Sequence, residues 1–427
     1  MDDGEGDRRE KRPALMRRAH EAVLAAEELL AAEAWGLIQL DEICRAAGIP
    51  RSTALLHLKA REEQEREALA EEAEARDDGA RRYHPRATLA HELIGRWRGL
   101  LAEKLDEPSL EVPQDIAELV SRLESLAQEA QGSLVMAWGM ATWSGKDPLA
   151  RDTAQLKWTH KLSGLARRDQ ARALVAPILV DVLLRRLQLT LPPLDPARFA
   201  TRFLYGWLPE RANLESFVRR TASHRQRDAL DRLILAVGRW GVPTPNGRLD
   251  LTATLANSNV SRGTLHNHLG RVPSLVLDLV SELLTSFESA LTSANFARLE
   301  CLVEEVTRTV ADFAAVWPIL LVTDHAPAAA KRLHAGAAAL LEGLLDVCPP
   351  VVPPEERGLF LLMLLGPLLV PRTPQVPEHA TPFAWTASVL LGAVRASRMI
   401  SASEHEVQDG QGESPRSRLP DSNGGEE

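Results

Sequence analysis

The chain of 427 residues is poor in aromatic residues and in cysteine, and it has no long hydrophobic run. Aromatic residues make up 4% of it, and the three cysteines, Cys44, Cys301 and Cys348, form no CxxC or CxxH spacing. This sparse, odd count excludes a disulfide framework and a zinc module. The longest apolar run, residues 359–370, is too short to span a bilayer, and the N-terminus has no signal-peptide core. We therefore expect a cytoplasmic protein with no membrane partner, metal or cofactor.

Catalytic motifs are also absent, since the sequence contains no GxGxxG, GxSxG or HExxH. The segment 139–146 looks like a phosphate loop, but its glycines are one residue too far apart. Asp147 also stands where such a loop needs Ser or Thr. We therefore expect that the protein is not an enzyme.

Ala and Leu dominate the sequence, and nearly all of its 50 basic residues are arginine. Because Ala, Leu, Arg and Glu are strong helix formers, this composition predicts an all-α fold. With 45% apolar residues the chain can bury sizeable cores, and its length suggests two or three domains.

The net charge of −9 lies at the two ends of the chain. Residues 1–7 carry four acids and no base, and residues 401–427 carry seven acids against two arginines. The body between them is neutral overall. The acidic balance therefore says little about the partners of the body.

An internal repeat is the most informative feature of the sequence. Residues 46–58 (AAGIPRSTALLHL) match residues 257–269 (NSNVSRGTLHNHL) at a constant offset of 211 residues. An amphipathic helix is expected before each copy, at about 13–34 and 225–240. Within each copy, a short helix leads to a bend at Gly48 or Asn259, residue types that tolerate a left-handed conformation. A second short helix starts near Pro50 or Ser261, and together these elements predict a helix-turn-helix.

The second copy, with VSRGTLHNHL, resembles the TetR-type transcription regulators, whose usual run is close to V-S-R-G-T-L-Y-H-H-F. The first copy keeps Arg51, Thr53 and His57 of this pattern, and Trp35 stands where the family usually has an aromatic residue. The resemblance covers about 50 residues in each half. It implies a helical ligand-binding and dimerisation domain after each module, and repression relieved by a small molecule.

Positive charge concentrates on the two modules, as expected for DNA-binding surfaces. Residues 8–61 have ten bases against seven acids, and residues 219–271 have nine against three. In this geometry the second short helix enters the major groove, where Arg51 and Arg262 can contact guanine with two hydrogen bonds. The candidate DNA-binding residues are Arg51, Ser52, Thr53, Leu55, Leu56, His57, Lys59, Arg61, Ser261, Arg262, Gly263, Thr264, His266, Asn267, His268 and Arg271.

The two copies differ in ways that favour the second as the stronger reader of sequence. Leu55 and Leu56 replace a hydroxyl and an imidazole that meet phosphates, and leucine can contact only a thymine methyl or a sugar. The matching residues of the second copy are polar, His266 and Asn267. For His57 and His268, a structural role in the helix core is as well supported as a contact with DNA.

We predict two fused TetR-like units that pack as an intramolecular pseudo-dimer. The apolar helix pairs 171–189/196–209 and 355–370/382–399 are expected to form the interface. The expected domains are a disordered arm (1–12), a first DNA-binding module (13–62), a first regulatory domain (63–215), a second module (216–274), a second regulatory domain (275–400) and a disordered acidic tail (401–427).

The expected partners are double-stranded DNA and a hydrophobic small-molecule effector, with the chain acting alone or as a homodimer. Aromatic residues among apolar helices can line an effector pocket, although they also suit an ordinary core. The candidates for this pocket are Trp97, Trp138, Trp143, Trp158, Trp207, Phe313, Trp317 and His325. The alternative is a ligand-binding or interaction protein in which one or both modules have lost DNA binding.

Overall fold

The computed structural model describes residues 4–33, 35–72, 85–104, 113–140, 168–186, 194–207, 317–322, 327–348 and 351–370, with Ser261, Gly263 and Gly392. Within these ranges the chain forms helices and no strand, which confirms the all-α prediction. The α-helices are α1 (Gly4–Ala32), α2 (Leu40–Ala46), α3 (Arg51–Glu72), α4 (Pro85–Lys104), α5 (Pro113–Glu129), α6 (Gln131–Gly139), α9 (Arg168–Arg186), α10 (Pro196–Tyr205), α17 (Pro327–Val347) and α18 (Arg357–Leu368). Two 3-10 helices, η3 (Trp317–Leu321) and η4 (Pro354–Glu356), complete the set.

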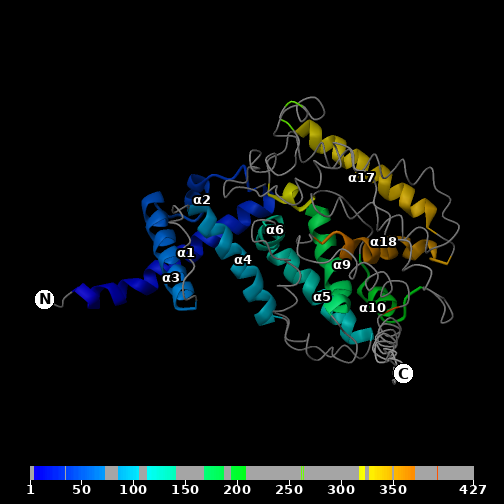
Figure 1. The fold of residues 1–427 in the computed structure, drawn as a ribbon, viewed down its shortest axis with the longest axis horizontal. Helices are drawn as coiled ribbons and strands as arrows, with labels where there is room; N and C mark the ends of the chain where they lie inside the picture. The colour runs from blue at the N-terminus through cyan, green and yellow to red at the C-terminus, as the bar shows by residue number, and fades with distance from the viewer. Residues whose placement is uncertain are drawn as a thin grey trace, which may run out of the picture.

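Helices α1, α2 and α3 pack against one another at the N-terminal end of the molecule (Figure 1). Their shared core contains Leu30, Trp35, Ile43, Ala54 and Leu58, each no more than 2% exposed. Helix α1 begins at Gly4, earlier than the expected start at Pro13, and runs through that proline. The acidic residues of its first turns favour a helix N-terminus, and the Arg, Lys and Glu that follow are strong helix formers.

Helices α4, α5 and α6 form the middle of the molecule, between this N-terminal group and α9 (Figure 1). Helix α5 is amphipathic, with buried residues at three- and four-residue steps from Ile116 to Ala127. Helix α6 is buried along its whole length from Gly132 to Gly139. A helix that is apolar all round must be covered by its neighbours, and α1, α4, α5, α9 and η3 pack against α6.

Helices α9 and α18, which come from opposite halves of the chain, cross closely (Figure 1). Each contains an internal proline, Pro177 in α9 and Pro367 in α18. At the crossing, a Cβ on Gly366 would lie only 2.5 Å from the Cα of Pro177, so only glycine fits there. Gly392 lies equally close to the end of α10, where its Cβ would be 2.3 Å from the carbonyl oxygen of Leu204.

Further contacts join the two halves around this crossing. The rings of Trp207 and Phe360 meet edge to face with centroids 5.1 Å apart. The guanidinium of Arg202 in α10 pairs with Glu356 in η4 at 2.6 Å. The backbone N–H of Gly36, just after α1, donates to the carbonyl of Val322, just after η3, at 3.0 Å. The N-terminal helices are therefore bonded directly to the second half of the chain.

Candidate nucleic-acid interface

The bend between α2 and α3 has the local structure that the sequence predicts. Helix α2 starts with a backbone N–H of Gln39 donating to the Glu42 carboxylate at 2.7 Å, which satisfies a donor at the helix start. It ends before Gly48, whose φ of 65° is a left-handed conformation. The N–H of Ile49 then donates back to the carbonyl of Cys44 at 2.9 Å and closes the bend.

The first part of α3 presents an exposed face next to this bend. Arg51, Ser52, Leu56 and Lys59 are exposed, and the Leu56 side chain is 61% exposed although it is apolar. Thr53, Leu55 and Arg61 are half-buried. The opposite face of the helix, with Ala54 and Leu58, packs in the core.

His57 lies in the core, at 4% exposure, and not on the surface where it would meet DNA. Neither ring nitrogen has a hydrogen-bond partner among the described residues. Burial, with a smaller effect of the nearby Arg18 charge, lowers the pKa of His57, which keeps the ring neutral. Of its two predicted roles, the structural one fits this position.

The three cations predicted to contact DNA from the first module each face a carboxylate. Both Asp41 oxygens accept from Nη1 of Arg51, at 2.8 and 3.0 Å. Lys59 lies 3.9 Å from Glu63, one turn later in α3. Arg61 pairs at 2.5 Å with Glu92 of α4, and this pair is only about a third exposed or less. Sequence reasoning missed Asp41 and Glu92 because neither lies in the repeated motif.

Most of the second predicted module lies outside the described residues. Ser261 and Gly263 are described, and both are exposed. Arg262, Thr264, His266, Asn267, His268 and Arg271 lie outside the described residues.

Among the described residues, three arginines of α4 and α9 bind the N-terminal helices. The guanidinium of Arg86 in α4 donates to the carbonyl of Trp35 and lies over its ring, 4.7 Å from the centroid. Arg96, also in α4, pairs with Glu27 of α1 at 2.5 Å.

The third arginine, Arg186 at the end of α9, donates to the last carbonyls of α1. Its two terminal nitrogens reach the oxygens of Leu30 at 2.7 Å, Ala31 at 2.5 Å and Glu33 at 2.8 Å. These carbonyls have no partner within the helix, and a cation there also interacts favourably with the helix dipole. Burial lowers the pKa of Arg186, a measure of how far the charge is removed from water. Helix α9, which crosses α18, thus caps the end of α1, the helix against which α2 and α3 pack.

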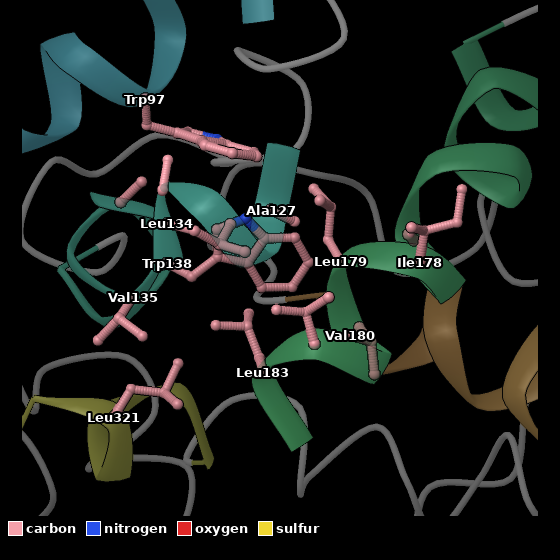
Figure 2. Packing of buried hydrophobic residues seen from close by; sticks show 14 of the residues in the cluster. Trp97, Ala127, Leu134, Val135, Trp138, Ile178, Leu179, Val180, Leu183 and Leu321 are labelled. Carbon is pink, nitrogen blue, oxygen red and sulfur yellow. The ribbon is translucent and has the colours of Figure 1, made fainter. Parts of the chain in front are cut away.

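Four of the predicted effector-binding residues are described, and all four lie in one continuous core. Trp97, Trp138 and Trp317 are 0% exposed and Trp207 is 6% exposed. Figure 2 shows Trp138 surrounded by apolar side chains of α5, α6, α9 and η3, with Trp97 beside it. The Trp138 and Trp317 rings have centroids 6.4 Å apart, so this aromatic pair joins the two halves. The remaining candidates, Trp143, Trp158, Phe313 and His325, lie outside the described residues.

A buried carboxylate, Asp181, lies in the middle of α9 and was not predicted from the sequence. It is 1% exposed and pairs with Arg185 at 2.5 Å, and Arg185 in turn lies 3.6 Å from Glu124 of α5. Burial raises the pKa of Asp181 to about 6 against the opposing effect of Arg185. A helix that is otherwise apolar at this point therefore carries a charge that costs stability.

Comparison with family models, with curated proteins and with solved structures found no match to this chain. Among the described residues, no helix is long and apolar enough to cross a membrane. In the same part of the chain, no group of three or more His, Cys, Asp or Glu side chains is placed to hold a metal ion.

Proposed function

We propose that the protein is a sequence-specific DNA-binding transcriptional regulator, with two non-identical DNA-binding modules in one chain. The observation that carries this proposal is the local structure of α2 and α3. A short helix, a left-handed bend at Gly48 and a second helix with an exposed first turn form the arrangement that enters the major groove. The sequence repeats this pattern 211 residues later on a more basic segment.

The crossing of α9 and α18 supports the proposed pseudo-dimer. Helix α9 overlaps most of the segment 171–189, and α18 lies within the segment 355–370; the sequence assigns these segments to matching places in the two halves. The contact of Gly392 with α10 involves the other two segments of the same interface. A fused pair of units would hold both DNA-binding modules at a fixed spacing without a second chain.

The cap that Arg186 forms on α1 suggests how an effector would act. A hydrophobic molecule that prefers one packing of α9 against its neighbours would move Arg186, and with it the end of α1. An effector shifts such an equilibrium only by its difference in affinity for the two packings. In this proposal, the packing that places both modules on DNA is the one without effector, and the protein acts as a repressor.

The alternative function is an interaction or ligand-binding protein in which one or both modules have lost DNA binding. The three ion pairs of the first module favour it, because a cation held by a carboxylate contributes less to phosphate binding. Binding of the full chain to random duplex DNA at several salt concentrations separates the two functions. A DNA-binding regulator loses affinity steeply with salt, whereas the alternative function shows no binding or no such slope.

A further inference from the structure

Asp41 is the carboxylate near α3 whose ion pair has the least evident structural role. Its side chain is 56% exposed and that of Arg51 is 60% exposed. A pair this open to water contributes little to stability, so packing does not require it. Both oxygens of Asp41 nevertheless accept from the one nitrogen Nη1 of Arg51. In the structure, the guanidinium of Arg51 in the first turn of α3 is therefore directed toward α2.

The position of Arg51 gives this pair a consequence for DNA recognition. In the proposed docking, residues of the first turn of α3 face the base edges. A guanidinium reads guanine by donating to two acceptors of the base, and it must leave Asp41 to do so. The carboxylate would then remain, without its partner, close to the phosphates. An unpaired charge of the wrong sign is a common way to select against a binding mode.

The repeat shows that the second module lacks this carboxylate. The residue 211 positions after Asp41 is Thr252, whereas the residue 211 positions after Arg51 is again an arginine, Arg262. The two modules therefore share the base-reading arginine and differ in the residue that holds it in the first half.

We propose that Asp41 is a specificity-determining residue that withholds Arg51 from guanine. The first module then selects bases through the exposed Leu56, which fits the methyl group of thymine, and the second module selects guanine through Arg262. The preferred site is accordingly asymmetric, with a thymine half and a guanine half. This inference rests on the proposed function.

The test is a binding-site selection from a random duplex library with the full-length chain and three variants. Asp41→Thr reproduces the residue of the second module, and Leu56→Ala marks the half-site that the first module contacts. Glu118→Gln is the control, since it also removes one carboxylate but from an exposed pair in α5, away from α3. Circular dichroism and thermal unfolding of each variant show that the fold is kept.

We expect Leu56→Ala to lower the affinity for thymine at one position about fivefold. Asp41→Thr should add a guanine preference in that same half-site and raise affinity for the guanine-containing site by up to about fivefold. Glu118→Gln should leave the selected site unchanged. If the wild type selects a site and Asp41→Thr selects the same one, the inference about Asp41 is wrong and the proposed function stands. If neither the wild type nor any variant binds duplex DNA, the inference about Asp41 and the proposed function are both wrong.

Discussion

Replacing Arg186 with methionine tests the connection between the α9–α18 crossing and the N-terminal helices. Methionine is shorter than arginine but keeps an unbranched apolar stem, and it removes the charge and every donor. The change leaves the carbonyls of Leu30, Ala31 and Glu33 without the guanidinium that now contacts them. Each hydrogen bond from a charged donor contributes about 1.5–3 kcal/mol. Because the three bonds share a single desolvation cost, we expect a total loss of about 2–4 kcal/mol.

The assay combines denaturant unfolding with amide hydrogen exchange, and its control is Arg122→Met. Arg122 pairs with Glu118 one turn earlier on the exposed face of α5, so its loss should cost less than about 0.5 kcal/mol. In Arg186→Met, exchange should speed up most in the last turn of α1, where the N–H of Glu33 bonds to Leu29. Equal unfolding free energies for the two variants, with unchanged exchange in α1, would refute the idea that Arg186 holds this helix.

Two further predictions concern α9 and the helix α18 that crosses it. Gly366→Ala should destabilise the protein by about 1–3 kcal/mol because the new Cβ would meet Pro177. The control, Gly95→Ala in α4, adds a Cβ with nothing within 4 Å and should stabilise the protein by up to about 1 kcal/mol. Equal unfolding free energies for the two variants would contradict the close crossing of α9 and α18. Asp181→Asn should stabilise the protein at pH 7.5 by up to about 3 kcal/mol, since the pKa of Asp181 rises from 3.8 to about 6 on folding. This gain in stability should fade as pH falls from 6 through 3.8, because below that range the carboxyl of Asp181 is protonated in both the folded and the unfolded state. A net loss of stability at pH 7.5, measured by equilibrium unfolding, would show that the pair with Arg185 outweighs the burial cost.

The sequence predicted the elements whose signals are local. The repeated motif predicts two short helices around Gly48, and the structure has a helix on each side of it, the short α2 before it and after it α3, which is longer than expected and runs to Glu72. The apolar helix expected at 355–370 is α18, Arg357–Leu368. The start of α1 was not predicted, since the helix begins at Gly4, before the expected start at Pro13.

The sequence could not predict contacts that depend on how helices pack. The sequence predicts that Arg51 contacts DNA but does not show that its side chain meets Asp41, which is ten residues away across the bend. From the sequence, His57 fits both the surface and the core, and in the structure it is buried, at 4% exposure. Arg186 and the end of α1 are more than 150 residues apart, and no pattern in either segment predicts their contact.

The central claim, that the chain reads DNA, is tested most directly by measuring the affinity of the full-length protein for duplex DNA across salt concentrations. We predict tight binding to an asymmetric selected site, with log affinity falling against log salt at a slope steeper than about −3, as several phosphate contacts require. We also predict at least about a thousandfold preference for that site over random duplex at the same salt. An affinity that is weak, independent of salt and equal for every duplex would contradict the account.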